Sequence, residues 1–476
     1  MTGIPWTTEE ICMATGGTVR SSGGGGRFDG IAIDSRSISK TDLFVAIKGE
    51  VHDGHTFVDA VAEGGAAGII VENTSKAASQ TDRWERKGIT CITVKETTAA
   101  LGALAAYNRK RAGITVVAIT GSNGKTTTRE MAAAVVSQRY ETLVPQGNFN
   151  NEIGLPLTLL ALSRRHRLAV LELGMNHPGE IRRLGQICRP DIGMITNIGP
   201  AHLEGVGSID GVKEAKAELL ETISTRGTVV LNADDKRVAG LDNRAAGRKV
   251  LFFGSSQRSH VRASDIAADA GGVSFRLHIG GDATRIRLKT TGAFMVANAA
   301  GAAAAGHELG LTVHEIKQGL ESFRPVGKRL NLIKLGSGIR VVDDTYNANP
   351  GSMRSAIETL SSLRGDQRAI LVVGDMLELG KHADALHQDI GAAAGRSGVT
   401  RLYITGAFAE SVATGAAGEK MDPGRIFIGG KEEILSDLTD RLQPGDWVLV
   451  KGSRGMKMET VVDGLKRWAE TVTHTQ

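Results

Sequence analysis

The 476-residue sequence predicts an α/β protein of three domains, with a doubly wound, mostly parallel sheet at its centre. Three observations support this prediction. The chain is longer than one ordinary domain. Its 41% hydrophobic and 23% charged residues are typical of a globular protein. Short apolar runs alternate with helical stretches over most of its length, which is the pattern of parallel strands joined by helices.

The first predicted domain covers residues 1–112 and is a small α/β unit. Short apolar runs at residues 30–33 and 68–71 are its strand candidates. A helical stretch at residues 98–110 closes the domain.

The second predicted domain covers residues 113–326 and carries the central sheet. Apolar runs and helical stretches alternate along it, as in a doubly wound fold. The strands are expected at residues 114–119, 168–173, 191–198 and 228–231, and the helices after Gly124 and at residues 179–188 and 211–223.

The third predicted domain covers residues 327–476 and is a smaller Rossmann-like unit. Pro325 and Gly327 mark its start, because the alternation begins again after them. Its strands are expected at residues 341–342, 369–373, 402–405 and 447–450, and its helices at residues 352–363, 383–394 and 431–442.

Charge and aromatic content argue against a nucleic-acid partner. The net charge is only +5, aromatic residues make up 4% of the chain, and no run of lysine and arginine is interleaved with aromatics. A small positive excess also suits anionic small substrates.

The sequence predicts a cytoplasmic protein without a membrane span. The N-terminal segment carries Glu9 and Glu10 and lacks the basic and apolar regions of a signal peptide. The longest apolar run, residues 292–306, is interrupted by Asn298 and is short for a bilayer. The three cysteines are far apart and form neither a metal-binding spacing nor a disulfide framework, which fits a reducing compartment.

A phosphate-binding loop (P-loop) is predicted between the first central strand and the helix after it. Glycines let backbone amides turn toward phosphate oxygens, and the helix N-terminus adds the positive end of a dipole. The lysine would reach the β and γ phosphates, and the first threonine would bind Mg²⁺. The loop and the first turn of the helix comprise Gly121, Ser122, Asn123, Gly124, Lys125, Thr126 and Thr127.

The P-loop match is to the shorter form G-x-x-G-K-T. Ile119 stands where the full Walker pattern has its first glycine. A glycine-rich turn with a surface lysine is the alternative. Phosphate binding is favoured because strand, loop and helix agree.

Polar residues follow two further strands of the predicted central sheet. Glu172 would face the same crevice as the P-loop, because the C-terminal ends of parallel strands meet at one edge. It is a candidate Mg²⁺ ligand, or else a helix cap or loop acid. His202 follows the strand at residues 191–198, where a lone histidine is usually structural. Lys216 lies 14 residues after His202, and its spacing alone indicates a solvated helix lysine.

Together these residues resemble the Mur ligases, and among them the branch that adds D-alanyl-D-alanine to a UDP-linked tripeptide. The resemblance covers nearly the whole chain. The stretch at residues 343–350, DDTYNANP, separates this branch from the diaminopimelate-adding branch, whose Asp-Asn-Pro-Arg motif is absent from the sequence. The resemblance rests on residues 34–36, 42–46, 53–55, 120–126, 147–154, 172–176, 215–218, 343–350, 374–380 and 451–455.

The resemblance implies an ATP-dependent amide ligase. ATP would phosphorylate the terminal carboxylate of UDP-N-acetylmuramoyl-tripeptide, and the amine of D-alanyl-D-alanine would attack the acyl phosphate. The products would be UDP-N-acetylmuramoyl-pentapeptide, ADP and phosphate, in a cytoplasmic step of peptidoglycan synthesis. Clustered cations and two Mg²⁺ ions would bring the anionic substrates together. A monomer is the expected state.

The resemblance also assigns roles to residues of this chain. Lys125, His202 and Lys216 would be catalytic. Thr126 and Glu172 would hold the Mg²⁺ ion of the nucleotide, and His202 would hold a second one. Lys216 would be carbamylated, which would turn a cation into a carboxylate-like metal ligand.

Further residues would bind the nucleotide and the two substrates. The nucleotide contacts would include Asn298, Arg329 and Asp344, the last as a ribose-binding acid. Phe294 stands where the family often has a histidine, and its ring offers stacking instead. The substrate contacts would be Ser35 and Arg36 for the uridine nucleotide, Asn148, Asn150 and Asn151 for the muramoyl peptide, and Tyr346, Asn347 and Asn349 near the dipeptide or the nucleotide.

Two other functions stay open at this point. A ligase of the same fold with another acceptor, such as a folylpolyglutamate or cyanophycin-type synthetase, would not need the uridine element at residues 34–36. A non-catalytic nucleotide-binding regulator would need only the P-loop and the Mg²⁺ groups. That regulator leaves Asp344 and Lys216 unexplained.

Overall fold

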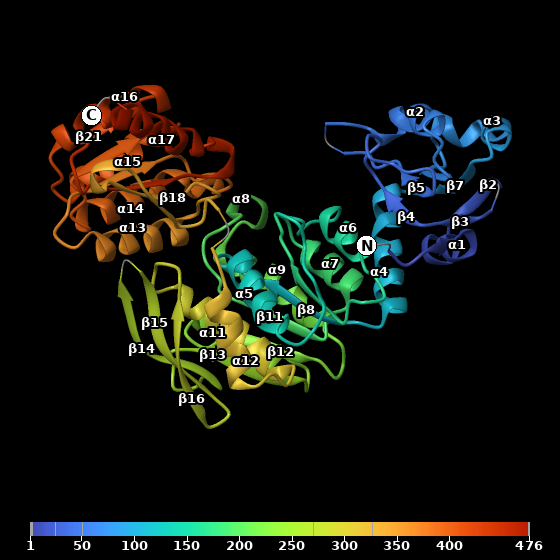
Figure 1. Cartoon of the computed structure of the whole chain (residues 1–476), viewed down its shortest axis with the longest axis horizontal. Helices are drawn as coiled ribbons and strands as arrows, with labels where there is room; N and C mark the ends of the chain where they lie inside the picture. Colours follow the sequence, from blue (N-terminus) through green and yellow to red (C-terminus); the bar gives the residue numbers. More distant parts are fainter. Residues whose placement is uncertain (1–2, 24, 50, 270, 326, 475–476) are drawn as a thin grey trace.

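The computed structural model describes residues 3–23, 25–49, 51–269, 271–325 and 327–474. Figure 1 shows three α/β units, with the central unit between the N-terminal and the C-terminal ones. Each unit is built on its own main sheet. The predicted three-domain α/β fold is confirmed. The predicted boundary at residue 326 lies outside the described residues.

The N-terminal unit has a five-stranded sheet in the order β2-β7-β6-β5-β4, and a separate antiparallel pair, β1 with β3. Only β2 runs antiparallel to its neighbour in the main sheet. Apolar clusters cover both faces of this sheet. The strands are Trp6–Thr7, Thr18–Ser21, Arg27–Phe28, Gly30–Ala32, Asp42–Val45, Gly68–Glu72 and Thr90–Val94 (β1–β7), and the helices are Thr8–Thr15, Val58–Glu63, Thr81–Arg86 and Thr97–Ala112 (α1–α4).

The central unit has a nine-stranded sheet in the order β16-β15-β14-β13-β12-β11-β8-β10-β9. Strands β8 to β14 pair in parallel, and their apolar residues are buried between helices on both faces. The strands are Thr115–Thr120, Thr142–Leu143, Leu168–Glu172, Ile192–Ile195, Thr228–Asn232, Lys249–Gly254, Val261–Asp269, Gly272–Ile279 and Asp282–Leu288 (β8–β16). The helices are Lys125–Val136, Gly154–Leu160, Glu180–Cys188, Leu203–Val206, Ile209–Thr222, Lys236–Ala239, Met295–Glu308 and Val313–Ser322 (α5–α12).

One part of the central sheet differs from the sequence prediction. No strand was expected between residues 249 and 288, yet β13 to β16 lie there, and β14, β15 and β16 form an antiparallel meander. Strand β15 buries Val273, Phe275 and Leu277, while Arg276 between the last two is exposed. This extension makes the sheet mixed rather than wholly parallel.

The apolar run at residues 292–306 forms most of α11 (Met295–Glu308) rather than a membrane segment. Its alanines are buried against α5 and the neighbouring strands, where small side chains allow close approach. Among the described residues, no helix is long and apolar enough to cross a bilayer.

The C-terminal unit has a six-stranded sheet in the order β17-β18-β22-β19-β20-β21, in which only β17 runs antiparallel to its neighbour. The four strands predicted in this domain lie in β18, β19, β20 and β22. The strands are Asn331–Lys334, Arg340–Asp344, Ala369–Val373, Arg401–Ile404, Ile426–Ile428 and Trp447–Lys451 (β17–β22), and the helices are Pro350–Arg364, Ala383–Arg396, Ala409–Gly418, Lys431–Arg441 and Glu459–His474 (α13–α17).

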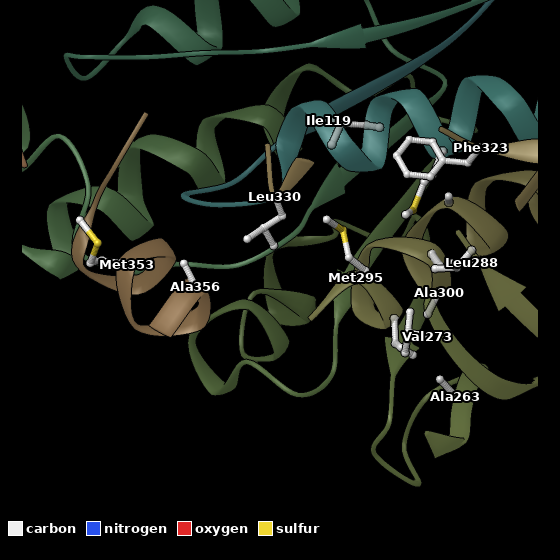
Figure 2. Packing of buried hydrophobic residues seen from close by; sticks show 14 of the residues in the cluster. Ile119, Ala263, Val273, Leu288, Met295, Ala300, Phe323, Leu330, Met353 and Ala356 are labelled. Carbon is white, nitrogen blue, oxygen red and sulfur yellow. The ribbon is translucent and has the colours of Figure 1, made fainter. Parts of the chain in front are cut away.

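One apolar cluster continues from the central unit into the C-terminal unit. It contains Met295 and Phe323 from the central unit and Met353 and Ala356 from α13, with Leu330 from the segment that joins the two units (Figure 2). Full burial of a large apolar side chain contributes about 1.5–3 kcal/mol. The cluster therefore stabilises one arrangement of the two units, with β18 and α13 held near the P-loop.

The cysteines provide a direct test of this packing. Burial raises the pKa of the Cys91 thiol to about 11 and that of the Cys188 thiol to about 12. Because the thiolate is the reactive form, we expect neither to react with DTNB at pH 8 in the folded protein, while half-buried Cys12 reacts slowly. All three should react in guanidinium chloride. More than one reactive thiol per folded chain would contradict this packing.

Candidate active site

The P-loop connects β8 to α5 and depends on two glycines. Gly121 has φ +153°, and a Cβ atom there would lie 1.9 Å from the Thr196 hydroxyl oxygen. Gly124 has φ +77°, and a Cβ atom there would lie 2.4 Å from Asn298 Oδ1. Any larger residue would therefore clash at both positions, so the glycines permit the tight turn that the sequence predicted.

Polar residues at the end of β11 hold the P-loop from one side. The backbone N–H of Asn123 donates to Asn197 Oδ1 at 2.8 Å, and Asn197 Nδ2 donates back to the Asn123 carbonyl at 2.9 Å. The Thr196 hydroxyl donates to the same carbonyl at 2.7 Å. Sequence analysis missed Thr196 and Asn197. Their place directly after a strand next to β8 is the signal that would have identified them.

Lys125 is the first residue of α5, and its ammonium lies over the P-loop. Nζ donates to the Gly121 carbonyl at 2.9 Å. Burial lowers the pKa of Lys125, and the nearby carboxylates of Glu172 and Glu378 oppose that effect. A partly buried cation at a helix N-terminus is suited to binding an anion such as a phosphate.

Glu172 ends β10 and is 2% exposed. Its Oε2 accepts from the Thr126 hydroxyl at 2.7 Å, and its Oε1 accepts from Asn150 Nδ2 at 2.8 Å. The Arg129 guanidinium lies 3.8 Å from Oε2. The structure thus brings the two predicted Mg²⁺ ligands, Thr126 and Glu172, into contact. Asn150, predicted to bind the muramoyl peptide, lies beside them.

A cation from the start of the C-terminal unit reaches the same place. Arg329 Nη2 donates to the Thr126 hydroxyl oxygen at 3.0 Å. Its guanidinium also lies over the ring of Tyr346, 4.0 Å from the centroid. Arg329 and Tyr346 therefore belong to one cluster with Thr126 and Glu172.

Asp344 ends β18 and is paired with a buried lysine. Lys451 Nζ donates to Asp344 Oδ2 at 2.5 Å and to the Asn347 carbonyl at 2.9 Å. Burial raises the pKa of Asp344, and the positive charge of Lys451 opposes that rise. Residues 451–455 contribute to the family resemblance, but sequence analysis gave Lys451 no role. Its partner lies 107 residues away, and the sequence does not show that the two meet.

Asn349 joins the C-terminal unit directly to the P-loop. It caps the N-terminus of α13, where its Oδ1 accepts from Ser352 N. Its Nδ2 donates to Asn123 Oδ1 at 2.7 Å. This contact places Asn349 beside the P-loop.

Lys216 lies on α9 and is 1% exposed. The interpretation of its spacing as a solvated helix lysine was therefore wrong, because α9 turns this face toward β11 and α7. Burial, followed by the nearby charge of Lys125, lowers the pKa of Lys216 well below its usual range, and Glu172 opposes this. In the described part of the chain, no hydrogen bond or ion pair holds its amine.

His202 precedes α8 and pairs with Glu378, a residue that sequence analysis gave no role. Its Nδ1 lies 2.7 Å from Glu378 Oε2. Burial lowers the pKa of His202, and the hydrogen bond to Glu378 opposes that effect. The charges of Lys125 and Lys216 lower it further. The hydrogen bond from His202 lowers the pKa of Glu378. The two shifts favour a neutral imidazole and an ionised carboxylate.

A cavity of about 1070 Å³ brings most of the predicted residues together. Its volume is at the upper end for small-molecule sites, as expected for more than one ligand. Among the described side chains of the Asp, Glu, His and Cys types, no group of three is arranged as a metal cluster. The predicted residues that line the cavity are Ser122, Asn123, Gly124, Lys125, Thr126, Thr127, Asn148, Asn150, Asn151, Glu172, His202, Phe294, Asn298, Arg329, Asp344, Tyr346, Asn347 and Asn349.

Four predicted site residues do not line this cavity, one of which is Gly121 of the P-loop. Ser35 and Arg36 lie in the N-terminal unit, where exposed Arg36 pairs with Asp34 at 2.8 Å. Lys216 lies behind the cavity wall, close enough to Lys125 and Glu172 for their charges to shift its pKa. The N-terminal unit reaches the cavity instead through Lys48, Gly49 and Thr98, which sequence analysis did not select.

A P-loop at the edge of a mostly parallel sheet, faced by charged groups of a second unit, defines a nucleotide-binding α/β protein. Three family models match the chain. The model described as "Mur ligase family, catalytic domain" matches residues 27–109, and "Mur ligase middle domain" matches residues 119–306. The model described as "Mur ligase, glutamate ligase domain" matches residues 328–454. The chain belongs to the Mur ligase family.

Relatives with known names and structures cover almost the whole chain. UDP-N-acetylmuramoyl-tripeptide--D-alanyl-D-alanine ligase of Escherichia coli is 36% identical over 92% of this chain and 94% of that protein. A crystal structure of MurF from Acinetobacter baumannii has a TM-score of 0.90 at 33% identity, covering 98% of this chain and 100% of that one. MurF ligase from Thermotoga maritima, solved in complex with ADP, has a TM-score of 0.82 at 28% identity, covering 93% and 98%.

Proposed function

We propose that this chain is the ATP-dependent ligase that joins D-alanyl-D-alanine to UDP-N-acetylmuramoyl-tripeptide. The observation that carries the proposal is the cavity, in which a P-loop, a buried carboxylate and residues of the DDTYNANP stretch meet. The names of the relatives support the same reaction. The reaction belongs to the cytoplasmic stage of peptidoglycan synthesis, and we propose a cytoplasmic, monomeric enzyme.

In this proposal the chemistry proceeds through an acyl phosphate. The peptide carboxylate attacks the γ-phosphorus of ATP, ADP leaves, and the amine of D-alanyl-D-alanine then attacks the acyl carbon. The tetrahedral intermediate collapses to the amide and releases phosphate and a proton. Lys125 stabilises the charge on the transferred phosphoryl group, and Arg329 adds a second cation near Thr126.

The residues at the edge of β10 fit a nucleotide-bound Mg²⁺ ion. Thr126 offers a hydroxyl and Glu172 a carboxylate, in contact with each other. Mg²⁺ usually takes one or two carboxylates and completes its shell with phosphates and water, so a larger acidic cluster is not needed. Bound there, Mg²⁺ neutralises phosphate charge during transfer. His202 and a carbamylated Lys216 would hold a second ion.

The remaining predicted roles divide between the three domains. Residues 1–112 would bind the UDP-sugar-peptide, with Ser35 and Arg36 at the uridine nucleotide. In the central domain, residues 113–326, Asn298 would contact the nucleotide and Asn148, Asn150 and Asn151 the muramoyl peptide. In the C-terminal domain, residues 327–476, Asp344 would bind the ribose. Tyr346, Asn347 and Asn349 would lie near the dipeptide or the nucleotide.

A substrate panel tests the proposed function. Purified protein should release phosphate from ATP only when UDP-N-acetylmuramoyl-tripeptide and D-alanyl-D-alanine are both present. With ¹⁸O in the peptide carboxylate, one label should appear in the released phosphate, because only an acyl phosphate transfers that oxygen. Equal turnover with lysine or diaminopimelate on the dipeptide-stage precursor would contradict the assignment. ATP binding without any ligation would favour a regulator instead.

A further inference from the structure

The contact between His202 and Glu378 joins two units at the edge of the cavity. His202 stands at the N-terminus of α8 in the central unit, and Glu378 follows β19 in the C-terminal unit. Nδ1 and Oε2 are 2.7 Å apart, across 176 residues of sequence. With the Glu378 oxygen as the acceptor of this contact, Nδ1 is the ring nitrogen that donates. The nitrogen left with a lone pair is Nε2, which has no partner among the described residues.

Both residues of this contact have an unusual backbone conformation. His202 has φ +56° and Glu378 has φ +63°, in the left-handed region that residues with a Cβ atom seldom occupy. The backbone N–H of Glu204 donates to the Glu378 carbonyl at 3.1 Å, which holds the two loops together. Such conformations persist where the surroundings fix them, and they concentrate at functional sites. Both partners line the cavity together with Lys125 and Glu172.

We infer that Glu378 is a positioning residue that acts through His202, keeping the Nε2 lone pair available in the cavity. The inference rests on the proposed function, because it takes the cavity to be the ligase site. Since the acid comes from the C-terminal unit, the histidine has its working tautomer only when that unit is seated on the central one. Packing of the C-terminal unit on the central unit therefore also completes the reacting site.

A double-mutant cycle tests whether Glu378 works through His202. Glu378→Ala should lower kcat by about 10–100-fold, the usual loss when a ligand's orienting partner is removed, and should change the KM for ATP far less. Glu378→Gln retains an acceptor oxygen and should recover much of the rate. In a His202→Ala background, Glu378→Ala should cause no further loss. The matched control is Glu204→Ala. Glu204 takes part in the same contact through its backbone N–H alone, so this substitution leaves that hydrogen bond in place.

A second readout does not depend on turnover. Nitrogen NMR of histidine-labelled protein, with His202→Ala to assign the signal, should show the Nδ1-protonated tautomer in the wild type and its loss in Glu378→Ala. If the wild type holds this tautomer but ligates no substrate, the proposed function fails while the positioning of His202 stands. Additive losses in the cycle, full activity of Glu378→Ala or an unchanged tautomer would overturn the inference.

Discussion

Replacing Lys125 with methionine is expected to reduce kcat/KM for ligation by about 10³-fold, a loss typical of removing a charge-stabilising donor from an active site. The ammonium is held inside the P-loop by the Gly121 carbonyl at 2.9 Å. It therefore lies at the α5 N-terminus, where backbone amides also face a bound anion. Methionine keeps the length of the side chain and removes its charge, so the loss would report on electrostatics rather than packing.

Initial rates of phosphate release, with both substrates present, measure this effect. Calorimetry with ATP separates weaker binding from slower transfer, and a thermal unfolding curve monitors the fold. We expect no loss of stability, because burial already disfavours the charged form of Lys125. Lys110→Met, at an exposed position on α4, is the matched control. Wild-type turnover by a folded Lys125→Met variant would exclude this lysine from phosphate stabilisation.

Several strands that the sequence predicted are buried on both faces, although β13, which is buried in the same way, was missed. Strands such as β8 and β10 consist of continuous apolar residues, which stand out in the sequence. Strands β14 to β16 were missed because they form a meander with exposed residues on one face. In β15 the buried Phe275 and Leu277 are separated by the exposed Arg276. A short alternating pattern of this kind is easily interpreted as a loop.

The residues of the candidate site also fall into a group that the sequence predicted and a group that it did not. The P-loop and Glu172 could be predicted because each follows a strand, and neighbouring parallel strands end at one edge. The pairs that complete the site join residues far apart in sequence, such as Asn349 with Asn123, 226 positions away. Which side chains meet there depends on how two units pack, and local sequence patterns do not encode that packing. Family resemblance supplied Asp344 and Lys216, and the geometry added Lys451 and Glu378.

The second large effect on activity is expected at Lys216, because the environment of this side chain disfavours an ammonium group. It is 1% exposed, and burial together with the charge of Lys125 lowers its pKa well below the usual range. A larger share of its amine is therefore neutral near pH 7 than in an ordinary lysine. A neutral amine adds CO₂ to form a carbamate and releases one proton. That anion would replace repulsion from Lys125 with attraction and would offer oxygen ligands to Mg²⁺.

Wild-type activity should accordingly fall in buffer freed of CO₂ and recover when bicarbonate is added. Lys216→Ala should lose about 10²–10³-fold in kcat and should not respond to bicarbonate, because it has no amine to modify. Lys213→Ala, one turn earlier on α9 and only partly buried, should keep both the rate and the bicarbonate response. Protein exposed to ¹³CO₂ should give a carbamate carbon signal that the Lys216→Ala variant lacks. Bicarbonate-independent activity without that signal would mean that Lys216 acts as an amine, and the second metal site would then lose one of its two proposed ligands.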